Sequence, residues 1–154
     1  MAEGLRIYLA GPLFSDGERA YLDELARRLR GRGHDVFVPH EQFTAGIVDL
    51  DPATVFRVDA AGVREANVLV AWLDGPMVDD GTACEIGMFA ELVGSGDARY
   101  RGIVGLVTDL RTQRRRGTQG EGINLFVAGA VRANGELAWS VDDALDAVDR
   151  FAGV

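Results

Sequence analysis

The chain of 154 residues contains a single cysteine, Cys84, and only two histidines, His34 and His40. One cysteine excludes an internal disulfide, and these three residues are scattered without the spacing of zinc ligands. We therefore expect a fold that needs no covalent cross-link, no metal and no cofactor. A reducing cytoplasm is the compartment that this cysteine content predicts.

Basic residues are few, because the chain has 16 lysine or arginine residues against 24 aspartates and glutamates. The formal net charge is therefore −8. Binding to the phosphates of a nucleic acid depends on a field of basic side chains, so a nucleic-acid polymer is not the expected partner. No apolar run approaches the ~18 residues of a membrane-spanning helix, and the first residues do not read as a signal peptide. We expect a cytoplasmic protein that binds small molecules.

Apolar segments alternate with amphipathic ones in the order of βαβ units. The continuous apolar run 67–73 predicts a strand that is buried on both faces and lies at the centre of a parallel sheet. The pattern predicts an α/β fold, a single domain over residues 1–154, with an open, doubly wound, mostly parallel five-stranded sheet and helices on both faces, as in flavodoxin-like and Rossmann-like proteins. The expected strands are 5–10, 35–38, 67–73, 102–107 and 136–139, the expected helices are 16–30, 52–66, 80–93, 124–131 and 141–151, and loops are expected at 40–51 and 109–122.

Glu85 lies within what should be the buried stripe of a helix. At about 100° per residue, Met88, Phe89, Leu92 and Val93 project around the direction of Glu85. Burying a carboxylate among apolar side chains costs several kcal/mol unless polar groups accompany it. This position therefore predicts a functional site, with Glu85 as a nucleophile or a general acid/base.

Other candidate groups gather at the edge of the sheet where the strands end and where ligands bind in such folds. Asp74 follows the third strand, Asp79 precedes the Glu85 helix, and Asp59 lies on the helix before that strand. Two carboxylates that flank a C–N bond at an acetal carbon permit retaining chemistry. Tyr8 could donate a hydrogen bond to Glu85. Simpler interpretations remain open, with Asp79 as a helix cap, Tyr8 as a core aromatic residue and Asp59 as an exposed helix position.

Three segments, 8–14, 74–87 and 123–125, resemble nucleoside 2-deoxyribosyltransferases, and the resemblance spans nearly the whole chain. It implies that Glu85 attacks C1′ of a deoxyribose to form a covalent glycosyl-enzyme. Tyr8 orients this glutamate, and Asp59 assists protonation of the base. Transfer of 2-deoxyribose between nucleobases is the implied activity, without a cofactor or a metal.

The same resemblance implies a set of substrate-binding residues. Gln42 contacts the base, Asp79 binds sugar hydroxyls, and Asn124 reaches into the site of a neighbouring subunit to hold the sugar 5′ end. The matching segments add Gly11, Asp74 and Gly81 to this set. The implied partners are a nucleoside, a free nucleobase and further copies of the chain, as a dimer or a hexamer with shared sites.

One departure concerns the segment 149–154, which lacks the aromatic and carboxylate-bearing tail that closes the neighbouring site in many members of the family. Looser closure admits water, so the resemblance predicts that hydrolysis competes with transfer.

Three alternatives remain open. A nucleoside 5′-monophosphate N-glycosidase would use the same Tyr8 and Glu85, and the arginines of 111–116 could bind its phosphate unless that segment is simply a solvated loop. The negative charges of Asp79 and Asp80 disfavour a phosphate in this site. The second alternative is a cytokinin-activating phosphoribohydrolase, but that group normally has Gly-Gly where this chain has Asp79 and Asp80. A non-catalytic nucleotide sensor could use the same fold, but it would have little reason to bury a carboxylate.

Overall fold

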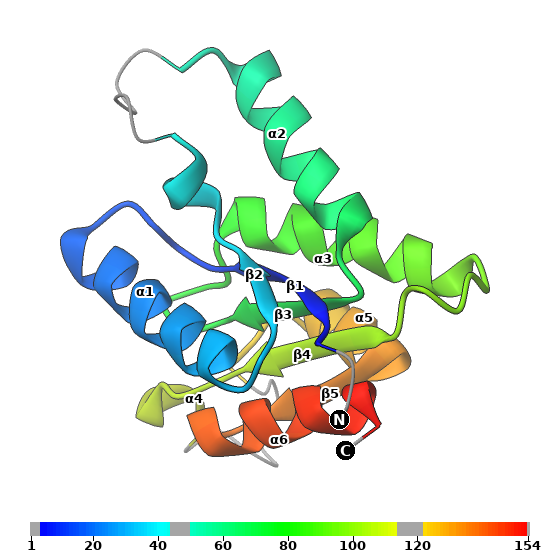
Figure 1. Cartoon of the computed structure of the whole chain (residues 1–154). Coiled ribbons are helices and arrows are strands. Elements are labelled where there is room, and N and C mark those ends of the chain that lie inside the picture. The colour runs from blue at the N-terminus through cyan, green and yellow to red at the C-terminus, as the bar shows by residue number, and fades with distance from the viewer. Residues whose placement is uncertain (1–3, 44–49, 114–121, 154) are drawn as a thin grey trace.

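The computed structural model describes residues 4–43, 50–113 and 122–153, and in these ranges five parallel strands form one sheet in the order β2-β1-β3-β4-β5. The predicted α/β class and the central position of β3 are confirmed (Figure 1). Every strand pair is parallel, so each crossover connection passes over a face of the sheet. The strands are β1 (Arg6–Ala10), β2 (Asp35–Phe37), β3 (Val68–Trp72), β4 (Gly102–Leu106) and β5 (Gly135–Ala138).

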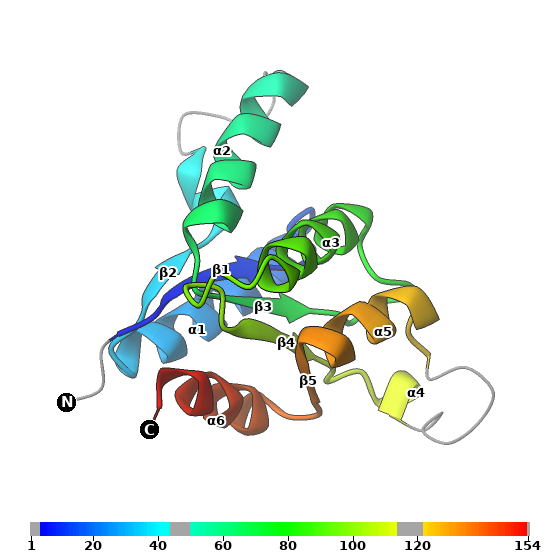
Figure 2. The same cartoon turned by 90° about the vertical axis from the view of Figure 1, so that its right-hand side faces the viewer.

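Helices cover both faces of the sheet (Figure 2). One face packs on α1 (Asp16–Gly31) and α6 (Val141–Ala152), through a core that includes Ile7 and Leu9 of β1. The opposite face packs on α2 (Pro52–Glu65), α3 (Asp80–Gly94) and α5 (Leu125–Asn134). Because side chains alternate along a strand, Tyr8 and Ala10 of β1 point to this second face, toward α2 and α3.

Two segments that the sequence predicted as loops contain short helices. Pro39–Gln42 forms the 3-10 helix η1, and Leu110–Gln113 forms α4. Pro39 suits the first position of a helix because its φ is restricted and no amide hydrogen is needed there. Ahead of α4, the Asp109 carboxylate accepts a hydrogen bond from the backbone N–H of Arg111 at 2.8 Å, which supports the turn. Such single turns give no hydrophobic periodicity, so the pattern of apolar residues could not reveal them.

The helix starts follow polar side chains that accept backbone hydrogen bonds. Ser15 and Glu18 form a reciprocal capping box at α1. Asp51 caps α2, which begins with a proline, and Ser140 caps α6 as predicted. At α3 the cap is Asp79, so the helix itself starts at Asp80.

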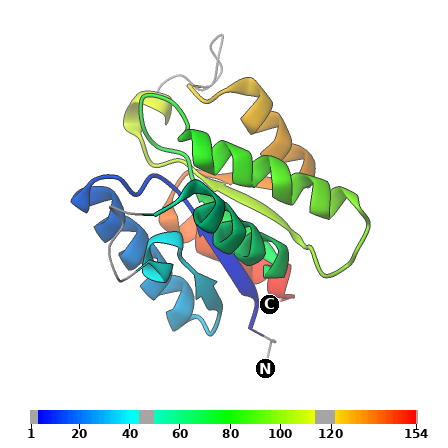
Figure 3. The same cartoon turned by 90° about the horizontal axis from the view of Figure 1, so that it is seen from above.

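Helix α2 is only partly seated on the sheet. Its buried residues are Ala60, Gly62 and Val63, all in the C-terminal half. The N-terminal half extends beyond the sheet, as Figures 1 and 2 show, and Phe56 on it is 59% exposed. Seen from above in Figure 3, α3 lies between α2 and α5.

Among the described residues, no helix combines the length and the apolar character needed to cross a bilayer.

Candidate functional site

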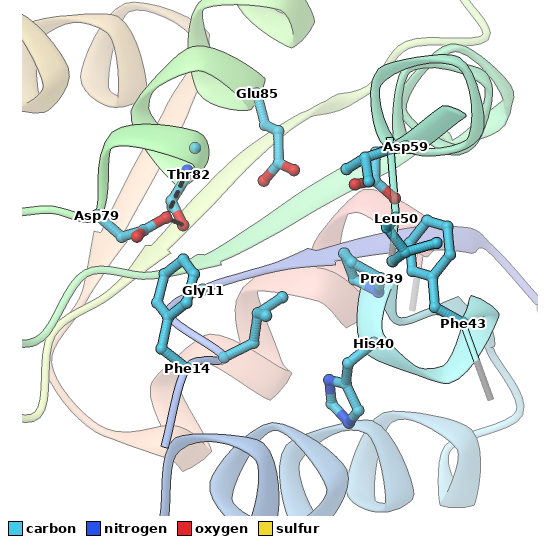
Figure 4. A pocket seen from close by; sticks show the side chains of 13 residues that line it. Gly11, Phe14, Pro39, His40, Phe43, Leu50, Asp59, Asp79, Thr82 and Glu85 are labelled. Atoms are coloured by element: carbon cyan, nitrogen blue, oxygen red, sulfur yellow. Dashed lines mark hydrogen bonds between the residues drawn. The ribbon is translucent and has the colours of Figure 1, made fainter. Parts of the chain in front are cut away.

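A cavity of about 350 Å³ lies beside the carboxyl end of β1, between α2 and α3. Its volume is within the roughly 300–1,000 Å³ typical of small-molecule sites. Polar residues from two helices reach it, namely Asp59 of α2 and Asp79, Thr82 and Glu85 at the start of α3 (Figure 4). The other side is mostly apolar and consists of Leu13, Phe14, Pro39, His40, Phe43, Leu50 and Val55.

Glu85 lines this cavity, and Tyr8 lies fully buried behind it. The Tyr8 hydroxyl donates a hydrogen bond to Glu85 Oε1 at 2.6 Å. Burial of the fully enclosed Tyr8 ring, together with the neighbouring Glu85 carboxylate, raises the pKa of Tyr8. The phenol therefore keeps its proton and acts as a donor. The strand and the helix thus bring together the two residues whose pairing the sequence predicted.

The pKa of the Glu85 carboxyl is determined by interactions that act in opposite directions. Burial raises its pKa, the hydrogen bond from Tyr8 lowers it, and the charges of Asp59 and Asp79 raise it, with a result of about 7. A carboxyl with this pKa is substantially ionised near neutral pH and is poorly solvated, as a nucleophile requires.

Asp59 faces the same cavity from α2. Burial raises the pKa of this carboxyl to about 6. Its Oδ1 atom is buried and has no hydrogen-bond partner among the described residues. An unpartnered carboxyl that holds a proton more tightly than usual is suited to give that proton to a leaving group. The position of Asp59 is therefore not that of a simple exposed helix residue.

Asp79 has the structural role that the sequence allowed for it. Its Oδ2 atom accepts hydrogen bonds from the Thr82 backbone N–H at 2.9 Å and from the Thr82 hydroxyl at 3.0 Å. Both bonds use one oxygen, so within the described part of the chain Oδ1 keeps its lone pairs for a ligand in the cavity. Asp79 can cap α3 and bind a hydroxyl group at the same time.

Two glycines complete the lining. Gly11 follows β1 and is buried, and a Cβ atom there would lie 2.9 Å from Leu22 and 3.3 Å from Trp72. Gly81 lies at the first turn of α3 and lines the same cavity. The absence of side chains at both positions keeps backbone at the cavity wall.

The structure does not bring Gln42, Asp74 and Asn124 into the cavity. Gln42 is exposed, and its amide donates to the Val38 carbonyl at 3.1 Å. Asp74 accepts hydrogen bonds from the backbone N–H of Thr108 at 2.7 Å and from the Thr108 hydroxyl, and thus joins the ends of β3 and β4.

Asn124 is the N-cap of α5 and accepts hydrogen bonds from the Phe126 and Val127 N–H groups at 2.9 and 3.3 Å. Its neighbours Leu125 and Phe126 are 68% and 86% exposed. Asn124 thus lies on an apolar surface away from the cavity of its own chain.

The sequence interpretation missed the apolar side of the cavity. Phe14 is 76% exposed and yet lines the site, so no burial pattern marks it. Phe43, Leu50 and Val55 come from the connection before α2 and from its first turns, where hydrophobic periodicity is absent or weak. Residues 44–49 of the predicted loop 40–51 lie outside the described residues.

Arg111 belongs to a different hollow, of about 190 Å³, with Gly75, Asp109 and Gly122. Its guanidinium donates to the Asp109 carboxylate at 2.6 Å, and these hydrogen bonds lower the pKa of Asp109 to about 2. Arg111 is thus neutralised by a neighbour. Residues 114–116, the other arginines of the proposed phosphate clamp, lie outside the described residues.

Within the described ranges, no group of three or more His, Cys, Asp and Glu side chains is arranged to hold a metal ion. Cys84 is exposed beside Glu85 on α3.

Comparison with known sequences gives consistent matches. The sequence profile of a family described as nucleoside 2-deoxyribosyltransferase matches residues 7–127. A nucleoside deoxyribosyltransferase from Limosilactobacillus fermentum is 33% identical over 101 residues, which are 56% of this chain and 60% of that protein. The chain thus spans less than two thirds of the length of this curated relative.

Solved structures share the fold. A conserved protein from Enterococcus faecalis V583 has a TM-score of 0.77 at 27% identity and covers 96% of this chain and 99% of its own. The 2-deoxyribosyltransferase of the psychrotolerant bacterium Bacillus psychrosaccharolyticus has a TM-score of 0.63 at 20% identity over 91% and 90% of the two chains. A 2-desoxiribosyltransferase from Leishmania mexicana has a TM-score of 0.61 at 18% identity over 96% of both. The last two likenesses concern the fold alone.

Proposed function

Because the chain belongs to the nucleoside 2-deoxyribosyltransferase family, we propose that it transfers 2-deoxyribose between nucleobases through a covalent intermediate on Glu85. The observation that supports this most directly is the 2.6 Å hydrogen bond from Tyr8 to a half-buried glutamate in a cavity of suitable size. An oriented carboxylate in an apolar wall is suited to attack an electrophilic carbon.

In the first step, an Oε atom of ionised Glu85 forms a bond to C1′ while the bond from C1′ to the base nitrogen breaks. The electron pair of that bond leaves with the base, and protonated Asp59 supplies the proton that makes the base a good leaving group. Tyr8 holds the attacking carboxylate in place without giving up its own proton. The product is a glycosyl ester on Glu85 and a neutral free base.

In the second step, a nitrogen of an incoming base attacks C1′ and Glu85 departs as a carboxylate. Asp59 accepts the proton that the new base loses, which returns both groups to their starting states. Water in place of the base yields free deoxyribose. Hydrolysis is therefore the competing outcome of the same intermediate.

We expect the sugar of the substrate to bind on the polar side of the cavity and the base to bind on the apolar side. Asp79 would accept hydrogen bonds from sugar hydroxyls beside Glu85 through Oδ1, and the backbone at Gly11 and Gly81 leaves room for the sugar. A flat base would lie against the apolar side near Phe14 and Phe43. A contact between Gln42 and the base stays a prediction from the resemblance, because Gln42 is not part of the cavity lining and its amide donates to the Val38 carbonyl.

Asp74 and Asn124 have indirect roles in this proposal. Asp74 supports the site by joining β3 to β4 at the sheet edge. Leu125 and Phe126 beside Asn124 are exposed, which supports a contact of this surface with a second copy of the chain. Asn124 would then contribute to the site of that second copy.

The proposal is tested by incubating the protein with deoxyinosine and adenine and separating the products. Formation of deoxyadenosine and hypoxanthine is expected, with some free deoxyribose from hydrolysis. Glu85→Ala should fold and yield neither product. Hydrolysis alone would make the protein an N-glycosidase, and unchanged deoxyinosine across purine and pyrimidine acceptors would contradict the activity altogether.

A nucleoside 5′-monophosphate is the less suitable donor on electrostatic grounds. Asp79 faces the cavity, and Arg111 is paired with Asp109 in a separate hollow. Deoxyinosine should therefore be cleaved faster than its 5′-monophosphate, and a strong preference for the monophosphate would favour the N-glycosidase alternative.

A further inference from the structure

We propose that Phe37 and Gly62 are positioning residues, which seat helix α2 so that Asp59 can give its proton to the leaving base. The inference rests on the proposed function and adds two residues that touch no substrate. It begins from a close contact between β2 and α2, on the side of the sheet that carries the site.

Gly62 lies on the buried side of α2 against the ring of Phe37. A Cβ atom at Gly62 would lie 2.8 Å from two carbons at the far end of that ring and 2.9 Å from a third. Carbon atoms in contact normally lie about 3.5–4.0 Å apart, so any side chain here must displace the ring or the helix by roughly 0.7 Å. Gly62 is therefore the point of closest approach that sets how deeply α2 sits.

The Phe37 ring has little freedom to move away. Phe37 is the register partner of Tyr8 on the neighbouring strand, so their side chains leave the same face of the sheet. The two rings stack with centroids 5.2 Å apart and planes at 16°. Tyr8 is in turn fixed by its hydrogen bond to Glu85. A side chain at position 62 would therefore either push Phe37 against Tyr8 and so shift Glu85, or displace α2 itself.

Asp59 depends on the seating of α2 more than a hydrogen-bonded residue would. It lies three residues before Gly62, which places the two on the same side of the helix. Its Oδ1 atom has no partner among the described residues, so no polar contact of that atom corrects its position. The N-terminal half of α2 is also unsupported by the sheet (Figure 2). A small shift at Gly62 therefore moves the carboxyl of Asp59 relative to Glu85.

The chemistry of the leaving group provides a selective measurement. Deoxyinosine needs a proton on its base as the C1′–N bond breaks. At mildly acidic pH, where N1 keeps its proton, the base of 7-methyl-2′-deoxyinosine is already cationic and departs as a neutral molecule without a proton from the enzyme. A displaced Asp59 should slow the first donor and spare the second. A displaced Glu85 should slow both.

The central experiment measures kcat/KM for both donors with Gly62→Ala. A misplacement of about 1 Å can cost about 10²-fold, so we expect a loss of that order for deoxyinosine and little change for the 7-methyl donor. Alanine is a better helix former than glycine, so lower helix propensity cannot explain the loss. Gly31→Ala in the last turn of α1 is the matched control, because nothing lies within 4 Å of a Cβ atom there and α1 packs on the face of the sheet opposite the site.

A second variant keeps the test valid if Gly62→Ala folds poorly. In the double variant Phe37→Leu with Gly62→Ala, the shorter side chain removes the close contact, so α2 should seat again. We expect the ratio of the two kcat/KM values to return toward that of the wild type. Phe37→Leu alone removes the stacking on Tyr8 and should slow both donors, with circular dichroism confirming the fold of every variant.

The inference fails if Gly62→Ala slows both donors equally or neither, or if adding Phe37→Leu does not restore the ratio. These outcomes differ from a failure of the proposed function, in which wild-type protein turns over neither donor.

Discussion

At the scale of single residues, the site consists of one phenol and three carboxyl groups in graded environments. Tyr8 donates to Glu85, and Asp79 shares its carboxylate with a helix cap. Asp59 is partly buried, and its Oδ1 atom has no partner among the described residues. The sequence predicted Glu85 because a carboxylate interrupts an apolar helix stripe. It could not predict that Asp59 is partly buried, since half of α2 extends beyond the sheet and its periodicity does not reveal which turns are covered.

The activity should depend on pH through this pair. Glu85 must be ionised and Asp59 protonated, and their pKa values are raised to about 7 and about 6. The two coupled carboxyls share one proton in this range, so a bell-shaped profile of kcat/KM with a maximum between these values is expected. At acid pH kcat/KM falls because Glu85 becomes protonated. At alkaline pH it falls because Asp59 loses its proton.

Asp59→Asn should remove the alkaline side of that profile and lower kcat/KM for deoxyinosine by about 10²–10⁴-fold. It should also move the acid side to lower pH, because the charge of Asp59 contributes to the raised pKa of Glu85. Initial rates between pH 4.5 and 9 provide the measurement. An unchanged alkaline side would show that another group supplies the proton.

At the scale of elements, strands and long helices followed from the sequence because their periodicity is strong. The central strand, the capped helices and the doubly wound order are as expected. The single turns η1 and α4 were missed, since one turn shows no period and its hydrogen bonds are local. The contact of Gln42 with the base rests on the resemblance alone and stays a prediction, and at η1 its amide donates to the Val38 carbonyl.

The start of α3 combines a structural and a binding role, and the two can be separated. Asp79→Ala removes the cap and should cost about 0.5–2 kcal/mol of unfolding free energy, and it should also raise KM for the nucleoside. Ser140→Ala removes the corresponding cap of α6 away from the site. A similar loss of stability with unchanged KM is expected there. If both variants raise KM equally, Asp79 acts only through stability.

At the scale of the whole molecule, the site lowers stability at alkaline pH. In unfolded chains the Glu85 carboxyl ionises near 4.5, whereas in the folded protein its proton is held up to about 7. The folded state binds more protons between these values, so stability is greatest below the unfolded pKa and falls as pH rises through the folded one. A shift of this size corresponds to about 3 kcal/mol.

Glu85→Gln removes this ionisation and should make the fall in stability shallower, while the raised pKa of Asp59 keeps part of it. At pH 5 the two proteins should have similar stability, and at pH 8 the variant should be more stable by up to about 3 kcal/mol. Denaturant unfolding at both values measures the difference. A variant that is less stable than the wild type at pH 8 would show that the ionised carboxylate is favourably solvated in the folded state.

The stacked rings of Phe37 and Tyr8 begin on β2, a strand of three residues at the edge of the sheet. Among the described strands, β2 pairs with β1 alone. Edge strands open more readily than central ones, since fewer contacts must break. Local opening of β2 would release Phe37 before the rest of the protein unfolds. Catalysis should therefore fade, on gentle heating, several degrees below the cooperative thermal transition of the protein.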